Sequence, residues 1–420
     1  MPSIVLLLPT TSYRADDFLA AAARIGVKVI AVSDRCHVLA QEWTEGPTPI
    51  EFRDADKAAG EIAAEVAARK PVAVVGLDDQ TAVIAALASA RLGLPHNPPA
   101  AVQAARNKAE SRERLQKAGV PTPRFEVASL YDLVPREPRA QGGLLPDVGF
   151  PCVVKPLVLS GSRGVIRARD PAELSAALSR IARLVRSPQV AVRRDPALAQ
   201  VIVEEFIPGP EVALEGLLTG GRLEVLALFD KPDPLDGPFF EETLYVTPSR
   251  HPQALQDAVV AAVDAAARAL GLREGPVHAE LRLSPAGPRI LEVAARSIGG
   301  LCGRALRFGV GVTLEELVLR HALGETAPAP AREQRAAGVL MLPIRRSGIL
   351  QEVRGGEAAR RVALIEDLVI TAHLHEELVA LPEGSSYLGF LFARGDSPAA
   401  VEAALREAGA LIEVVVAPKL

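Results

Sequence analysis

Short apolar runs alternate with alanine-rich amphipathic stretches over the first hundred residues. Apolar runs of roughly four to eight residues indicate buried strands, whereas apolar residues that recur every three or four positions indicate helices with one buried face. The alternation predicts strands at 4–8, 27–32 and 72–76, and helices at 15–25, 55–68 and 79–92. This order predicts an α/β unit with an open parallel sheet and helices on both faces.

Polar residues follow two of these predicted strands. Ligands of an open parallel sheet lie beyond the carboxyl ends of its strands, so Thr10, Thr11, Ser12 and Asp78 are placed for polar contacts. Helix caps and turns are the alternative role of these four residues. The segment has no GxGxxG motif, and a dinucleotide site is therefore not predicted.

The rest of the chain divides at two proline-rich segments, 93–99 and 327–330. Between them we expect helices at 100–105, 108–118, 171–184 and 251–270, a strand from Arg124, a loop at 135–147, and a strand at 201–207. After them we expect strands at 338–345, 362–371, 387–393 and 411–416 and a helix at 398–408. The predicted parts are an α/β domain at 1–98, a central α+β domain at 99–328 with a subdomain at about 122–200, and a β-rich domain at 329–420.

A strand, a lysine and a glycine-rich loop come together at 150–165. Residues 152–154 are apolar and lead into Lys155, and residues 160–164 read Ser-Gly-Ser-Arg-Gly. Backbone amides of such a loop bind anionic oxygens, and the ammonium adds charge, so the segment predicts a phosphate-binding flap. A hairpin loop with a solvated lysine is the alternative. The Walker pattern GxxxxGK[ST] is absent, so a nucleotide would bind without a P-loop.

Two glutamates are expected to face each other in a late hairpin. Residues 278–283 alternate between polar and apolar side chains, and residues 289–293 return as a second strand. The segment between them, Ser284-Pro-Ala-Gly-Pro288, has the residue types that favour a turn. A three-residue loop at 285–287 would place Glu280 opposite Glu292, where two carboxylates need a cation between them. Magnesium fits, because it takes one or two carboxylates together with water and phosphate. A solvated charged strand face is the alternative, and a register slip of one residue would separate the pair.

Other charged residues extend this set. Arg296 would bring a guanidinium group to the same place as the two glutamates. Hydrogen bonds from a base or a ribose could be accepted by Glu204, Glu205 and Glu211, and the alternative is that these three are ordinary surface carboxylates. The chain has eight lysines against thirty-nine arginines. Because arginine supplies most of the positive charge, a lysine beside apolar residues indicates a position that needs the compact charge of an ammonium group. Such lysines are Lys108, Lys155 and Lys231.

Composition limits the function classes. With 49% hydrophobic and 23% charged residues, a net charge of −4 and a pI of about 6.1, the chain has neither the basic excess of a nucleic-acid binder nor a polybasic membrane patch. Its three cysteines, Cys36, Cys152 and Cys302, have no CxxC spacing and give no disulfide framework. The first nine residues lack the basic region of a signal peptide, so we expect a cytoplasmic protein.

From about residue 106 to 324 the chain resembles the ATP-grasp superfamily. The pieces that carry the resemblance, in order, are Asn107-Lys108, Gly119-Val-Pro-Thr-Pro-Arg-Phe125, Pro151-Cys-Val-Val-Lys-Pro156 with the flap at 160–164, Glu204-Glu205-Phe206 with Gly209 and Glu211, and Glu280 with Glu292 and Arg296. The preceding sheet resembles the N-terminal domain of this superfamily, and the tail resembles the C-terminal domain of carboxylate–amine ligases and biotin-carboxylase-like enzymes.

The resemblance implies a role for each matching residue. Lys108 and Lys155 would hold ATP phosphates beneath a mobile loop that contains Gly161, Ser162 and Gly164. The strand Glu204, Glu205, Phe206 and Ile207 would recognise adenine, Glu211 the ribose, and Glu280 and Glu292 Mg²⁺, with Mn²⁺ as an alternative. Arg296 would steady the transferred phosphate. Where the family reads E-x-N-x-R, Ala294 replaces the asparagine, as in bacterial L-amino-acid ligases, which this stretch resembles.

These residues lead us to expect a magnesium-dependent ligase that activates a carboxylate as an acyl-phosphate and joins it to an amine, with an amino acid as the preferred acceptor. The segment 297–304 would floor the acceptor pocket, with Arg304 on a substrate carboxylate; a glycine-broken helix start is the alternative. Lys231 could reach a phosphate or an acid. The tail could wall the site or form a homodimer contact. The alternatives are a bicarbonate-activating carboxylase of the biotin or purine type and an ATP-binding regulatory protein without turnover.

Overall fold

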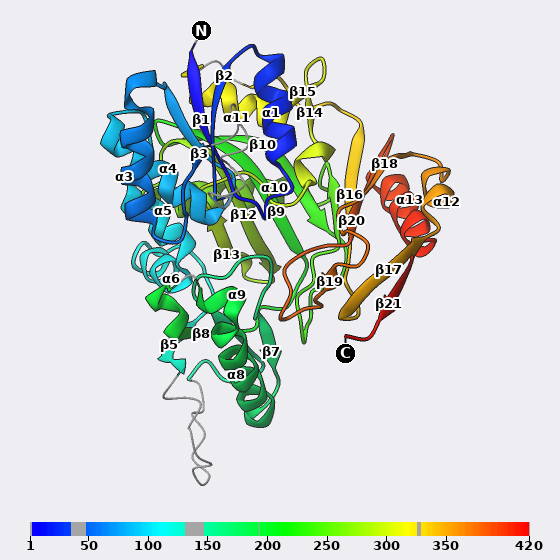
Figure 1. Ribbon diagram of the computed structural model, residues 1–420. Helices are drawn as coiled ribbons and strands as arrows, with labels where there is room; N and C mark the ends of the chain where they lie inside the picture. Colours follow the sequence, from blue (N-terminus) through cyan, green and yellow to red (C-terminus); the bar gives the residue numbers. More distant parts are fainter. Residues whose placement is uncertain (1, 35–47, 131–146, 193, 326–328, 420) are drawn as a thin grey trace.

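The computed structural model describes residues 2–34, 48–130, 147–192, 194–325 and 329–419 (Figure 1). The expected loop at 135–147 falls almost entirely outside these residues. None of the helices in the described ranges combines the length and the apolar character that crossing a bilayer requires.

The N-terminal unit is a parallel four-stranded sheet in the order β3-β2-β1-β4. Its strands are β1 (Ser3–Leu8), β2 (Lys28–Ser33), β3 (Thr48–Pro49) and β4 (Ala73–Gly76). Helices α3 (Ala55–Val66) and α4 (Asp79–Leu92) pack on the face that carries Val5 and Leu7, and α1 (Ala15–Arg24) lies on the other face. The predicted open parallel α/β sheet is confirmed.

A second four-stranded sheet, in the order β5-β8-β6-β7, lies below the first in Figure 1 and forms the lid over the central pocket. Its antiparallel strands are β5 (Phe125–Ser129), β6 (Cys152–Pro156), β7 (Ile166–Ala168) and β8 (Gln200–Glu205). Helix α8 (Pro171–Arg186) covers its apolar face, where Val154 and Ile166 meet Leu178 and Ile181. Strand β8 ends at Glu205, two residues earlier than expected, although the Phe206 amide still donates to the carbonyl of Pro151.

The largest sheet has eight strands in the order β13-β12-β9-β10-β11-β16-β20-β18. These strands are β9 (Glu211–Thr219), β10 (Arg222–Lys231), β11 (Leu244–Thr247), β12 (Gly275–Ser284), β13 (Gly287–Ala294), β16 (Ala336–Leu342), β18 (Ile365–Ile370) and β20 (Gly389–Gly395). It therefore continues across the boundary expected at 328, and the three-domain division stays a prediction.

Helices cover both faces of this sheet. Helix α10 (Gln253–Leu270), with α5 (Pro99–Arg106), packs on the face that carries Val212 and Leu214. Helix α11 (Leu314–Ala322) and the N-terminal unit pack on the face of Ala213 and Leu217. Because side chains alternate along a strand, the polar residues that share a face with Ala213 are directed to one side of the sheet.

The β-rich tail is confirmed, with two strands, β17 (Gly348–Arg354) and β19 (Glu377–Leu378), that the sequence pattern did not predict. Strand β17 pairs with β19 and β21 (Glu413–Ala417) in a three-stranded sheet. Its Ile349 and Leu350 are consecutive rather than alternating with polar residues, and a register irregularity follows Leu350. This irregularity hides the period of two that identifies a half-buried strand. Helix α13 (Pro398–Ala410) lies over β16 and β20.

Candidate active site

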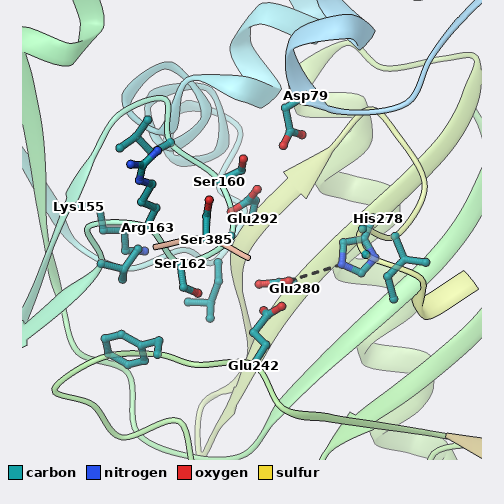
Figure 2. Close-up of a pocket in the computed structure, with 18 of the residues that line it drawn as sticks. Asp79, Lys155, Ser160, Ser162, Arg163, Glu242, His278, Glu280, Glu292 and Ser385 are labelled. Carbon is teal, nitrogen blue, oxygen red and sulfur yellow. Dashed lines mark ion pairs between the residues drawn. The ribbon is translucent and has the colours of Figure 1, made fainter. Parts of the chain in front are cut away.

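A cavity of about 500 Å³ lies between the lid and the eight-stranded sheet. All four parts of the fold contribute to its lining: the N-terminal unit, the lid, the large sheet and the C-terminal region. Of the candidate site residues, those on the lining are Lys108, Lys155, Gly161, Ser162, Glu204, Glu205, Phe206, Ile207, Glu211, Glu280, Glu292 and Arg296. Figure 2 shows the flap residues and Lys155 on one side of the pocket and the acidic residues on the other.

The lid side of the pocket is positively charged, and neighbouring side chains and a backbone carbonyl hold its cations in place. Lys155, at the end of β6, forms a 2.5 Å ion pair with Glu204 of the neighbouring strand β8. The other oxygen of Glu204 pairs at 2.7 Å with Arg112, which lies on α6 (Lys108–Lys117) and is buried. The Lys108 ammonium donates to the carbonyl of Leu159 at 2.7 Å and so joins α6 to the start of the flap.

These contacts determine the charge state of the lid residues. Burial lowers the pKa of Lys155, and the Glu204 carboxylate only partly opposes this. Burial alone would raise the pKa of Glu204, but Arg112 and Lys155 outweigh it and the net pKa is lowered. The sequence suggested that Glu204 presents a carboxylate to a base; it is instead 1% exposed and supports Lys155.

The two glutamates of the late hairpin face each other, as predicted, but the path differs from the one expected. Ser284 pairs with Gly287, so the loop contains two residues instead of three. Leu281 then pairs with Ile290, and a bulge on β13 at Leu291 restores the Glu280–Glu292 pairing. The expected three-residue loop, which would pair Leu283 with Arg289, is therefore wrong, because Leu283 pairs with Pro288.

Glu292 is free to bind a cation. Within the part of the chain that the structure describes it has no ion pair or hydrogen bond, and it lines the pocket beside Glu280. Glu280 lies between Glu292 and Lys231, and burial would raise its pKa, but Lys231 and His278 lower it overall. Two carboxylates with one unpaired member form a donor set suited to Mg²⁺.

A buried ammonium occupies the neighbouring acidic cluster. One oxygen each of Glu211, Glu242 and Glu280 lie within 4.8 Å of one another. The Lys231 ammonium contacts all three, at 2.5, 2.6 and 3.4 Å, and the side chain is 2% exposed. Burial would lower the pKa of Lys231, but the three carboxylates raise it well above its usual value. Lys231 therefore does not reach a phosphate, and a metal ion at Glu280 must lie on the side of Glu292.

Strand register brings these charges together. Lys231 pairs with Glu211 across β10 and β9, and Arg282 pairs with Glu211 across β12 and β9. Both carboxylate oxygens of Glu211 are thus held by cations, Lys231 at 2.5 Å and Arg282 at 3.0 Å. A ribose at Glu211 would share oxygens that already accept from these two side chains.

His278 continues the same face of β12. Its Nδ1 lies 3.1 Å from Glu215, and its Nε2 lies 3.5 Å from Glu280. Burial would lower the pKa of His278, but the two carboxylates raise it to about 9. Glu215 also accepts from the amide of Ile298 at 3.0 Å, so this pair joins the sheet to the segment that follows Arg296.

Arg296 is held at the opposite end of the pocket by an acid from the N-terminal unit. Its Nε and Nη2 donate to Asp79, the first residue of α4, at 2.9 and 3.2 Å. Burial would raise the pKa of Asp79, but Arg296 outweighs this and lowers it. The adjacent Gly299 and Gly300 line the cavity, and their role as the floor of an acceptor pocket stays a prediction.

The structure does not bring every candidate to this pocket. Arg304 pairs with Asp17 at 2.8 Å and lines a separate cavity, so we do not assign it a substrate carboxylate. Gly164, the last residue of the flap, is not on the lining, and its amide donates to the Pro382 carbonyl. Glu205 lines the pocket but pairs with Arg124 at 2.9 Å. Asp78 caps α4, as its alternative role required, and also lines the pocket.

Four important residues were missed by sequence reasoning: Asp79, Arg112, Glu242 and Tyr245. Arg112 lies in a helix that reads as solvated, with five other charged residues among its ten, and only its burial reveals it. Glu242 and Tyr245 lie around the start of β11, where the Tyr245 hydroxyl donates to Glu242 at 3.0 Å. Asp79 directly follows the predicted Asp78, and the Arg296 pair crosses 217 residues.

A cleft clamped between a small antiparallel lid and a large sheet, with lysines on the lid and carboxylates on the sheet, defines the ATP-grasp class of folds. Family models agree along the chain: an ATP-grasp N-terminal domain at 19–96, an ATP-grasp domain at 148–305, and the L-amino acid ligase C-terminal domain 2 at 340–417. The chain belongs to the ATP-grasp family.

Three curated relatives are named as a synthase or as ligases. The chain is 30% identical over 298 residues to carnosine synthase 1 of Gallus gallus (68% of this chain, 32% of the relative) and 28% identical over 250 residues to alanine–anticapsin ligase of Bacillus subtilis (56% and 50%). It is 30% identical over 244 residues to a D-alanine–D-alanine ligase of Synechococcus (54% and 67%). The chain thus spans about a third to two thirds of the curated relatives it matches.

The solved structure of an L-amino acid ligase from Bacillus licheniformis resembles this chain over its whole length, with a TM-score of 0.77, 25% identity and 99% of both chains covered. N5-carboxyaminoimidazole ribonucleotide synthetase from Thermotoga maritima has a TM-score of 0.69 at 16% identity, which shows a shared fold alone.

Proposed function

We propose that this protein is an ATP-dependent, ADP-forming carboxylate–amine ligase of the L-amino-acid type, with small-molecule acid and amine substrates. The observation that carries the proposal is the opposition of two walls across one cleft. Lys155 and the flap lie on one wall, and the paired Glu280 and Glu292 with Arg296 lie on the other. A nucleotide triphosphate with a divalent ion matches this division of charge.

The residues present fit a magnesium ion. Glu292 is unpaired among the described residues, and Glu280 faces it from the adjacent strand. Mg²⁺, or Mn²⁺ in its place, would be held by these two carboxylates and, when bound, supplies positive charge beside the phosphate oxygens. Ala294, where the family pattern has asparagine, provides no third side-chain ligand.

In the first reaction, a carboxylate oxygen of the acid substrate bonds to the γ-phosphorus of ATP while the bond to the bridging oxygen of ADP breaks. An acyl-phosphate and ADP result. Lys155, supported by Glu204 and Arg112, and Lys108 neutralise phosphate oxygens. Arg296, fixed in orientation by Asp79, binds the transferred phosphoryl group.

In the second reaction, the amine nitrogen bonds to the acyl carbon, the carbon–oxygen bond to phosphate breaks, and the nitrogen loses a proton. The products are an amide and phosphate. Water would compete with the amine, and the flap at 160–164 over the pocket excludes it. Gly299 and Gly300 form the floor against which the acceptor lies.

The test is a screen of amino-acid pairs with ATP and Mg²⁺ that measures ADP and the amide product together. Equimolar ADP and amide support the ligase. Phosphate release that depends on bicarbonate instead of an amine would support a carboxylase, and ATP binding without turnover would support a regulatory protein. The matched variants are Glu292→Gln, which we expect to raise the Mg²⁺ requirement or to abolish turnover, and Glu407→Gln on α13 as a control. A homodimer and a cytoplasmic location stay predictions.

A further inference from the structure

A loop of the C-terminal region touches the flap that closes the active-site pocket. We name residues 382–387, between β19 and β20, the latch loop. The Gly164 amide donates to the Pro382 carbonyl at 2.8 Å, and the Arg163 Nε donates to the Glu383 carbonyl at 2.6 Å. A methyl group placed on Gly161 would lie 3.3 Å from the Cβ of Ser385. Figure 2 shows Ser385 beside Ser160 and Ser162 of the flap.

The side chain of Glu383 makes a second connection, to the helix that covers the lid. Arg180 of α8 pairs with Glu383 through its Nε and Nη2, which donate to different carboxylate oxygens, Nη2 at 2.8 Å. The guanidinium also lies over the ring of Phe239, 4.9 Å from its centroid. Glu383 therefore holds the flap through its main chain and the lid helix through its side chain.

The latch loop itself is fixed at its base. The Gly384 amide donates to the Ala380 carbonyl at 2.9 Å, and a Cβ at Gly384 would lie 1.8 Å from the Val379 carbonyl oxygen, so only glycine fits this bend. The Tyr387 amide donates to the hydroxyl of Tyr13 in the N-terminal unit at 3.2 Å. A loop anchored at this end gives the moving lid a fixed surface to close against.

We infer that the latch loop holds the lid closed during acyl-group activation, with Glu383 and Ser385 as positioning residues. This inference rests on the proposed function, because its effect is to keep water from the acyl-phosphate. The contacts suit this role because Arg180 and Glu383 are each 37% exposed, and exposed ion pairs are weak enough to break in every cycle. The carbonyl groups of Pro382 and Glu383 accept hydrogen bonds from the flap and so fix the orientation of the flap in the closed position.

The first experiment reverses the charges of the ion pair. Arg180→Glu and Glu383→Arg each place like charges together, and the double variant restores an opposite pair. With the amino-acid pair that gives most product, we measure phosphate released per amide formed. Each single variant should raise this ratio by about fivefold, the size expected when a weak attraction becomes a weak repulsion. The double variant should recover at least half of the change, although it lacks the Phe239 contact.

The matched control is Arg169→Glu. Arg169 pairs with Glu173 on the same lid helix, is exposed, and does not contact the latch loop. Its ratio of phosphate to amide should equal that of the unmodified protein. The inference is overturned if both single reversals leave the ratio unchanged, or if the double variant releases as much phosphate per amide as the singles.

A second experiment does not depend on catalysis. Gly161→Cys with Ser385→Cys, in a Cys36→Ser background, places two Cβ atoms close to the separation of roughly 3.5–4.5 Å that a disulfide needs. The remaining Cys152 and Cys302 are buried. We expect a cross-link under mild oxidation, with a yield that rises when Mg²⁺ and adenosine 5′-(β,γ-imido)triphosphate are added. If the cross-link forms but the unmodified protein makes no amide with any amino-acid pair, the proposed function is refuted and the latch is not; if no cross-link forms, the latch is refuted.

Discussion

Replacing Lys231 with methionine tests whether one buried ammonium organises the acidic side of the active site. The substitution keeps an unbranched side chain, one atom shorter, and removes the only cation that contacts Glu211, Glu242 and Glu280 together among the described residues. Removing one partner of a buried ion pair costs about 3–5 kcal/mol, because the remaining charges are left without compensation. With an unfolding entropy of about 2.1 cal/mol/K per residue over 420 residues, that loss corresponds to a fall in Tm of roughly 3–6 °C.

The geometry also predicts how the loss can be reversed. The three carboxylate oxygens lie within 4.8 Å of one another, which is twice the typical calcium–oxygen distance of roughly 2.4 Å. A Ca²⁺ ion can therefore replace the ammonium in the Lys231→Met variant. We expect the variant to regain much of its Tm when Ca²⁺ replaces EDTA, by a larger increment than the unmodified protein shows.

The assay is thermal unfolding followed by circular dichroism, with EDTA, Mg²⁺ or Ca²⁺, for the unmodified protein and two variants. Lys57→Met is the control, because Lys57 is exposed and forms a 3.8 Å pair with Glu61 within one helix. That change should alter the free energy of unfolding by less than about 0.5 kcal/mol. The reasoning is refuted if Lys231→Met is as stable as the control in EDTA, or if Ca²⁺ affects both variants equally.

Three further predictions concern other parts of the site. Glu204→Gln should destabilise the lid most at neutral pH. Because the pKa of Glu204 is lowered in the folded protein, its contribution to stability is complete above its usual pKa of 4.5 and is lost as the pH falls through the lowered value. The stabilities of the variant and the parent, measured by urea unfolding, should therefore converge in acid. Glu292→Gln should raise the Mg²⁺ concentration needed for half-maximal ADP formation by about 10- to 100-fold or abolish activity, and equal Mg²⁺ dependence would exclude Glu292 as a ligand. Gly209→Ala should lower the free energy of unfolding in urea by about 1–3 kcal/mol, because Gly209 has φ +119° and a Cβ there would lie 2.3 Å from the Leu283 carbonyl oxygen. Gly60→Ala, within helix α3 and with open space around it, should instead raise it by up to about 1 kcal/mol.

The sequence by itself determined the local elements and the identity of most charged residues around the pocket. Apolar runs and helical periodicity predicted the N-terminal sheet and α4 over Asp79–Leu92, because burial of a single face leaves a regular pattern. The phosphate flap and the Glu280–Glu292 pair could be predicted because each depends on residues close together in the chain.

Only the tertiary structure decided which charged side chains pair with one another. Arg112 meets Glu204, Asp79 meets Arg296, and Glu383 meets Arg180 across long stretches of chain, and no local pattern encodes such pairs. The bulge at Leu291 likewise decided the register of the glutamate pair, since two different loop lengths give the same pairing. Packing and strand order set these contacts, because an ion pair, buried like Arg112–Glu204 or exposed like Arg180–Glu383, forms only where the fold has already placed its two members.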